Sequence, residues 1–254
     1  MLILINLDTA IERRARMVAQ LDAMRLPFAR VGIDLRRASP PAIAERLRVE
    51  FPMLRFNLRR MSGAEVGCWM SHLTAWQRLR DSNAPACTVI EDDLILAPAF
   101  GGVTTALAAV TAADDDGECD RAHDVIYLGT SSRNISQRRR AWVNGLAVHA
   151  PVGVIFNTWG YVVRRAWVER LFATGGAIDM PIDHFLGGRA RWCRPRIGVL
   201  QPTLVREDPQ LGRASQIAPH TTRLDRATLV ESLRRALLDS RLSDLYYRTV
   251  YRVL

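Results

Sequence analysis

The stretch VIEDDLIL, residues 89–96, sets three carboxylates, Glu91, Asp92 and Asp93, between two apolar runs. The apolar residues that lead into the trio have the pattern of a buried β-strand. Three negative charges at the end of such a strand repel one another, and a strand core offers no compensation for that cost. We therefore expect a positively charged group to answer them.

The chain around this stretch indicates an α/β domain. Residues 2–7 read as a short buried strand, residues 10–24 have the apolar period of a helix, and residues 28–34 read as a second strand. This β-α-β start favours a parallel sheet. A further strand is expected over residues 86–90, so that the acidic trio follows directly at its end.

Later segments fit the same plan. Ser62 and Glu65 form the capping box S-G-A-E ahead of a helix that runs to about Arg80. Residues 131–140 are polar and rich in arginine, which predicts a mobile loop. Further elements are expected as a helix opening at Ser39, a helix at 103–110, a helix from Arg165 to Gly175, and strands at 124–128, 146–149, 158–163 and 197–200. The simplest organisation is one α/β domain over residues 1–222, followed by an amphipathic helical tail over residues 223–254.

The chain is strongly basic. All 35 of its basic residues are arginine, and the formal net charge is +9. A coding bias toward arginine explains the absence of lysine, but the surface should still attract anions such as phosphates, nucleotides or anionic lipid headgroups. Nucleic acid is not the expected partner, because the arginines are spread along the chain and no nucleic-acid-binding motif is present.

Cysteine usage and apolar runs indicate a cytoplasmic protein. The four cysteines are scattered without the spacing of a zinc site or a disulfide framework, so reduced thiols are expected. The opening MLILINLD is too short an apolar run for a signal peptide, and no run approaches the ~18 apolar residues of a spanning helix.

The position of the trio suggests a ligand site. In open α/β sheets, ligands bind outside the carboxyl ends of the strands. Glu91 with Asp93, or Asp92 with Asp93, can share Mn²⁺ or Mg²⁺ through oxygen ligands, and such ions keep positions open for waters and substrate phosphates. The alternative is an acidic turn that simply follows a strand.

Five short motifs, one of which contains the trio, follow one another along the chain. They are INLD at 5–8 followed by Arg13 and Arg14, GAEVGCWMSHL at 63–73, VIEDD at 89–93, WGYVV at 159–163 and PIDHFL at 181–186. This ordered series resembles glycosyltransferase family 25, the bacterial lipopolysaccharide and lipooligosaccharide glycosyltransferases, to which the collagen galactosyltransferases are distantly related. The resemblance covers residues 2–205.

The resemblance implies a fold and a reaction. The fold would be a GT-A-like, Rossmann-type nucleotide-sugar-binding domain with a mixed, mostly parallel central sheet. The reaction would be a metal-dependent transfer of a sugar, most often galactose from UDP-galactose, to a glycan acceptor with inversion of the anomeric centre. The metal would be Mn²⁺ or Mg²⁺.

The resemblance also assigns roles to residues. Asn6, Leu7 and Asp8 would receive the uridine, and Glu91 and Asp92 would contribute to the donor site. Arg13 or Arg14 could reach a phosphate bidentately, although a solvated helix face is the alternative. Ser71 and His72 would also bind the donor, although a helical histidine is commonly a structural residue. Gly160 and Tyr161 would line the sugar pocket, where the tyrosine could stack on a pyranose.

An inverting transfer needs one base to take the proton of the attacking hydroxyl. Asp183 is the candidate, because apolar Ile182 and Phe185 could partly desolvate its carboxylate. The alternative role of Asp183 is to cap a short helix, and His184 is the alternative base. Asp93 and Glu91 would hold the metal, and the late His220 could fold back over the diphosphate as a third ligand.

Two further readings stay open. The basic tail could dock on the anionic inner face of a membrane, where lipid-linked acceptors reside, or simply pack on the domain. The chain could also be a catalytically silent paralogue that binds nucleotide sugars. The retained Glu91, Asp93 and Asp183 argue against silence.

Overall fold

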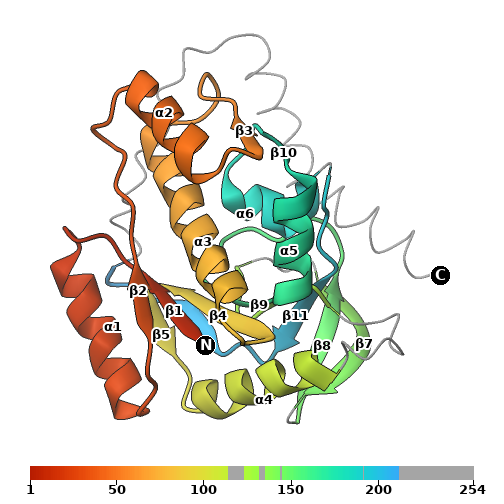
Figure 1. Ribbon diagram of the computed structural model, residues 1–254. Helices are drawn as coiled ribbons and strands as arrows, with labels where there is room; N and C mark the ends of the chain where they lie inside the picture. Colours follow the sequence, from red (N-terminus) through yellow and green to blue (C-terminus); the bar gives the residue numbers. More distant parts are fainter. Residues whose placement is uncertain (114–122, 132–134, 144, 191, 212–254) are drawn as a thin grey trace, which may run out of the picture. The chain divides into compact units, whose positions relative to one another are not determined.

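A mixed eight-stranded sheet forms the centre of the protein in the computed structural model (Figure 1). The structure describes residues 1–113, 123–131, 135–143, 145–190 and 192–211. The strands lie in the spatial order β2 (Ala29–Val31), β1 (Leu2–Ile5), β4 (Ala86–Glu91), β9 (Gly160–Arg164), β6 (Val125–Tyr127), β11 (Ile197–Gln201), β8 (Leu146–Pro151) and β7 (Ile135–Val143).

Six of these eight strands point in one direction, and only β9 and β8 run the other way. Strands β1, β2 and β4 pair in parallel, as do β6 and β11. Strand β9 is antiparallel to both β4 and β6, and β8 is antiparallel to both β11 and β7. The predicted mixed, mostly parallel α/β sheet with a β-α-β start is confirmed.

Two apolar cores cover the two faces of the sheet. Helices α3 (Gly63–Asp81) and α5 (Arg165–Thr174) pack on one face, where Val89 of β4 points, and α1 (Ile11–Ala23) and α4 (Phe100–Ala113) pack on the other, where Ile90 points. Figure 1 shows these two helix layers on either side of the strands. Because both faces are covered, β4 is buried along its length until it reaches Glu91.

Helix starts follow the signals in the sequence. The Ser62 side chain accepts a hydrogen bond from the Glu65 amide, and the Glu65 carboxylate accepts one from the Ser62 amide, which confirms the capping box of α3. Ser39 caps helix α2 (Pro40–Glu50), in which a proline occupies the first turn. These caps fix where the two helices begin.

One segment differs from expectation. Part of the predicted mobile loop at residues 131–140 forms β7, which pairs with β8. Within the described residues β7 is the last strand of the sheet, and a polar, arginine-rich sequence is typical of a strand in that position. The prediction of a loop was therefore wrong for β7.

Four short strands were not anticipated. Strand β3 (Leu54–Phe56) pairs with β10 (Gly176–Ile178), and β5 (Leu94–Leu96) pairs with β12 (Val205–Glu207). The β5 strand is the second apolar run of VIEDDLIL, so the trio lies where the end of β4 passes into a strand of another sheet. A short helix α6 (Ile182–His184) and a π-helical turn η2 (Phe185–Arg189) follow β10.

The described residues include no helix that is both long enough and apolar enough to cross a membrane. Cys68, Cys87 and Cys193 are free thiols, as expected. The predicted tail at 223–254, the domain boundary at residue 222, His220 and Cys119 lie outside the described residues.

Candidate functional site

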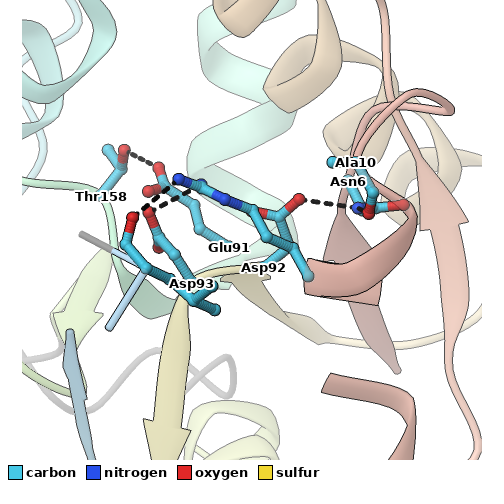
Figure 2. Close-up of polar contacts among 8 residues, drawn as sticks. Asn6, Ala10, Glu91, Asp92, Asp93 and Thr158 are labelled. Carbon is cyan, nitrogen blue, oxygen red and sulfur yellow. Dashed lines mark hydrogen bonds and ion pairs between the residues drawn. The ribbon is translucent and has the colours of Figure 1, made fainter. Parts of the chain in front are cut away.

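The carboxyl ends of β1 and β4 lie beside the beginning of β9 at one end of these strands, which we call the strand edge. Ile5 lies opposite Glu91, and Ile90 lies opposite Gly160. The residues that follow or precede these positions, Asn6, the acidic trio and Thr158, therefore gather at the same edge. Figure 2 shows Asn6 reaching Asp92 and Thr158 reaching Glu91 across this edge.

Asp92 joins the first and fourth strands. Its Oδ2 accepts a hydrogen bond of 2.7 Å from Asn6 Nδ2, and Asn6 Nδ2 also donates to the Ala10 carbonyl over 3.1 Å. Asp92 is only 9% exposed, and this burial raises its pKa, an effect opposed by Asn6 and by the charge of Arg13. Asp92 and Asn6 thus fix the turn that leads from β1 into α1.

Arg13 is the positive group that answers the trio. Its Nη1 lies 3.3 Å from Asp92 Oδ1 and 3.1 Å from Asp93 Oδ2, and its Nη2 donates to the Leu211 carbonyl over 3.1 Å. The Arg13 side chain is 11% exposed, so it does not belong to a solvated helix face. A guanidinium in this position offsets the repulsion between the two aspartates.

One carboxylate oxygen of Asp93 is unsatisfied. Its Oδ1 is buried and has no hydrogen-bond partner among the described residues. Burial, followed by the negative charge of Glu91, raises the pKa of Asp93 to about 7, although Arg13 opposes the shift. A buried carboxylate oxygen without a partner is costly, so this atom is the most evident place for a bound cation or a donated hydrogen bond.

Glu91 is held from two sides. Thr158 Oγ1 donates a hydrogen bond to Glu91 Oε1, and His72 Nε2 lies 3.8 Å from the same oxygen. His72 has no exposed surface, and its Nδ1 lies 2.7 Å from the Tyr161 hydroxyl. His72 therefore lies beneath Glu91, inside the core, rather than at a surface open to a ligand.

The carboxylates fit a divalent cation only in part. Across the ranges that the structure describes, no three His, Cys, Asp or Glu side chains are arranged to hold a metal ion. Mg²⁺ and similar ions, however, are commonly bound through one or two carboxylates together with substrate phosphates. The open Asp93 Oδ1 with the nearby Glu91 fits a cation of this kind, for which the ligand supplies most of the coordination.

The other residues predicted for the donor site lie in varied places. Leu7 is half-buried, and Asp8 is exposed and forms ion pairs with Arg30 and, at 4.0 Å, with Arg14. Asn6, Asp8, Arg13 and the trio thus lie around one strand edge.

Ser71 has a structural position. Its hydroxyl donates to the Gly67 carbonyl over 2.8 Å and accepts from the Ile33 amide over 3.0 Å. The side chain is 1% exposed, and it fastens α3 to the segment that follows β2. Ser71 therefore supports the strand edge from behind and does not face it.

Gly160 and Tyr161 also lie inside the protein. A Cβ at Gly160 would lie 3.3 Å from side-chain atoms of Ile90 and Val205, so apolar side chains pack closely against this glycine. Tyr161 has no exposed surface, and its ring stacks on His72 at 5.7 Å. The expectation that these two residues line a sugar pocket is corrected, because apolar side chains and His72 already cover them.

Asp183 is in the first turn of α6, where Pro181 is the N-cap residue, so Asp183 is not the helix cap. Its Oδ1 accepts a hydrogen bond of 2.8 Å from the His184 amide. Burial followed by the charges of Asp183 and Glu91 raises the pKa of Tyr127, and these same two carboxylates also act on the Cys68 thiol. Asp183 and Glu91 therefore share an electrostatic neighbourhood although they lie far apart along the chain.

Thr158 is the site residue that sequence reasoning missed. It precedes β9, and it reaches Glu91 only because β9 runs antiparallel to β4, so that the start of β9 lies beside the end of β4. The polar Thr158, two residues before the buried GYVVR strand, was the available signal. That signal points to Glu91 only when the antiparallel direction of β9 is known.

The chain is similar to known proteins of one family. A family model described as glycosyltransferase family 25 (LPS biosynthesis protein) matches residues 1–186. A glycosyltransferase 25 family member of Anopheles gambiae is 25% identical over 72% of this chain and 30% of its own length. Human procollagen galactosyltransferase 2 is 25% identical over 72% of this chain and 29% of its own length.

Some relatives are named as inactive. The human inactive glycosyltransferase 25 family member 3 is 28% identical over 50% of this chain and 20% of its own length. The chain thus matches less than a third of the length of each of these relatives. Since the family model covers the β-α-β start, the capping-box helix, the acidic trio and Asp183, this chain belongs to glycosyltransferase family 25.

Proposed function

We propose that this chain transfers a sugar from a UDP-sugar donor to a glycan acceptor, and that the strand edge around Glu91, Asp92 and Asp93 binds the donor diphosphate. The observation that supports this most is the open, buried Oδ1 of Asp93 beside the Arg13 guanidinium. An unsatisfied carboxylate oxygen next to a guanidinium, at the carboxyl end of a strand, suits a ligand that consists of a metal ion and a phosphate group. Galactose is the first donor sugar to test, because a relative is named as a galactosyltransferase.

In this proposal, different residues would contact different parts of the UDP-sugar donor. Asn6, Leu7 and Asp8 follow β1 and would face the uridine, and Arg13 and Arg14 lie in the first turn of α1 near the phosphates. Asp93 and Glu91 would hold Mn²⁺ or Mg²⁺ together with the diphosphate. When bound, such an ion supplies positive charge that stabilises a departing diphosphate.

Asp183 is the proposed base. In an inverting transfer it would take the proton of the acceptor hydroxyl, whose oxygen attacks the anomeric carbon from the face opposite the departing UDP. The Asp183 carboxylate accepts a hydrogen bond from the His184 amide, which orients it, and leaves its other oxygen for the acceptor. His184 stays the alternative base.

The second candidate is a silent nucleotide-sugar-binding protein. The ion pairs of Arg13 with Asp92 and Asp93 already neutralise part of the trio, and a human relative is named inactive. Binding of a UDP-sugar without turnover would favour this candidate.

The experiment is UDP release from a panel of UDP-sugars, with and without Mn²⁺, in the presence of glycan acceptors. Wild type is compared with Asp93→Asn and with Glu45→Gln, in which an exposed carboxylate of α2 becomes an amide without touching the strand edge. Metal-dependent, donor-selective turnover that Asp93→Asn abolishes and Glu45→Gln preserves is expected. Absence of turnover with every donor and acceptor would refute the proposal.

The proposed setting is the cytoplasmic face of a membrane, with a lipid-linked acceptor as in lipopolysaccharide or a related surface glycan. The net charge of +9 favours contact with anionic headgroups. Co-flotation of the full chain with vesicles that contain anionic lipid, and its loss at high salt, would support this contact. Equal behaviour with neutral vesicles would count against it.

A further inference from the structure

Four buried or half-buried polar groups from three elements form one line that ends at Glu91. Trp76 Nε1 donates to the Tyr161 hydroxyl over 3.0 Å, and the Tyr161 hydroxyl lies 2.7 Å from His72 Nδ1. His72 Nε2 then lies 3.8 Å from Glu91 Oε1, which also accepts from Thr158. The line joins α3, β9 and the end of β4.

The chemistry of these groups sets the direction of the hydrogen bonds. An indole N–H can only donate, so the Tyr161 oxygen is an acceptor toward Trp76. Tyr161 has no exposed surface, and His72 Nδ1 is the acceptor that the structure offers to its single hydroxyl proton. A buried hydroxyl proton without an acceptor would be costly. His72 Nδ1 is therefore the unprotonated nitrogen of the ring.

The other imidazole nitrogen then faces Glu91 with its proton. His72 Nε2 is buried and has no hydrogen-bond partner within 3.5 Å among the described residues. The nearest carboxylate oxygen is Glu91 Oε1 at 3.8 Å, and a modest movement of the carboxylate toward the ring would complete a hydrogen bond. In the Nδ1–H tautomer, by contrast, a bare Nε2 lone pair would face a carboxylate.

We propose that His72 is a positioning residue, which Tyr161 and Trp76 hold in the Nε2–H tautomer so that it orients the Glu91 carboxylate opposite Thr158. His72 then acts on the donor only through Glu91, since it has no exposed surface of its own. Partners of this kind behind a ligating group commonly change affinity or activity by about 10–100-fold when they are removed. The consequence for turnover rests on the proposed function, whereas the tautomer does not.

Two histidine variants separate orientation from packing. Glutamine can place an amide N–H near the position of Nε2, whereas asparagine reaches only the position of Nδ1. We expect His72→Gln to keep the donor KM and kcat within about threefold of wild type, and His72→Asn to lose about 10–100-fold. If His72 only filled space, His72→Gln would not keep more activity than His72→Asn. Thermal unfolding of both variants checks that they fold.

The tautomer is measured directly on the full chain by long-range ¹H–¹⁵N correlation of the histidine rings, with the His72 signals identified by their loss in His72→Gln. The Nε2–H pattern is expected in wild type. Tyr161→Phe, which removes only the hydroxyl, is expected to give a mixture of tautomers. An Nδ1–H pattern in wild type, or equal losses in His72→Gln and His72→Asn, would overturn the proposal. If wild type turns over no UDP-sugar, the proposed function fails and the tautomer measurement decides this proposal alone.

Discussion

Arg13 is the residue that allows Asp92 and Asp93 to lie side by side. Its guanidinium contacts both carboxylates, and all three side chains are less than one-fifth exposed. Replacement by glutamine would leave two largely buried carboxylates without their cation. We expect Arg13→Gln to lower the free energy of unfolding by about 2–4 kcal/mol, since breaking a buried ion pair strands the remaining charge.

The matched control is Arg16→Gln, one helical turn along α1. Arg16 also pairs with a carboxylate, that of Asp208, but its side chain is 48% exposed. Surface pairs of this kind contribute about 0–1 kcal/mol. Urea unfolding of both variants at neutral pH tests the difference, and equal losses would show that burial of the Arg13 cluster is not what matters.

Asp93 predicts a pH dependence of stability. Its pKa is raised from 3.8 to about 7 by burial and by the charge of Glu91. Between these values the unfolded chain releases the proton of Asp93 while the folded chain keeps it. This contribution to stability is therefore fully present below about pH 4, falls as the pH rises, and is lost above about pH 7.

The measurement is the difference in unfolding free energy between wild type and Asp93→Asn from pH 5 to pH 8. An asparagine cannot ionise, so the variant should gain on wild type as the pH rises through this range. The comparison cancels groups that titrate in both proteins. A difference that stays constant, or that shifts in favour of wild type, would contradict a raised pKa at Asp93.

At the scale of elements, the loops after β1 and β2 hold the strand edge together through backbone contact. A Cβ at Gly32 would lie 2.0 Å from the Asn6 carbonyl oxygen, which is impossible without moving one of the two loops. Asn6 in turn positions Asp92. We expect Gly32→Ala to destabilise the protein by about 1–3 kcal/mol or more and to weaken donor binding.

Gly102 in α4 provides the opposite case. A Cβ there would meet nothing within 4 Å, so alanine should fit and favour the helix. We expect Gly102→Ala to stabilise the protein by about 0.5–1 kcal/mol, measured in the same unfolding experiment. If both glycine variants changed stability in the same direction, close approach at Gly32 would not be the determining contact.

Short sequence signals predicted where helices begin, because a helix start depends on contacts between residues that are close together in the chain. The capping box at Ser62 and the cap at Ser39 gave the starts of α3 and α2, because a cap is made by residues three or four positions apart. Strand β7 could not be predicted in this way. Its central residues, SQRRR, are polar. Its pairing with β8 depends on the position of the strand in the sheet, which the local pattern does not contain.

At the scale of the whole molecule, the sequence predicted which strand end holds the site but not which side chains face it. The apolar run before Glu91 predicted a strand that ends in acidic residues, and β4 does end at Glu91; that this strand end binds a ligand stays a prediction. His72, Ser71, Gly160 and Tyr161 belong to the same motifs yet are buried behind the edge. Their depth depends on how α3 and β9 pack on each other, and a motif does not encode that packing by itself.

The sequence predicted a positive group near the trio but did not identify the residue that pairs with it. The repulsion among the carboxylates required a cation, and the structure supplies Arg13 from α1. The open oxygen of Asp93 leaves room for a second positive group in addition to Arg13. Whether the trio is a ligand site or a self-contained acidic turn thus depends on what Asp93 binds.

The most direct test is calorimetric titration of UDP into the full chain, with and without Mn²⁺, for wild type, Asp93→Asn and the surface control Glu45→Gln. We expect UDP binding to need the metal and to be lost or at least tenfold weaker in Asp93→Asn, roughly the effect of removing a ligating contact. Binding should be unchanged in Glu45→Gln. UDP binding that ignores both the metal and the substitution at Asp93 would contradict the claim that this strand edge binds the donor diphosphate.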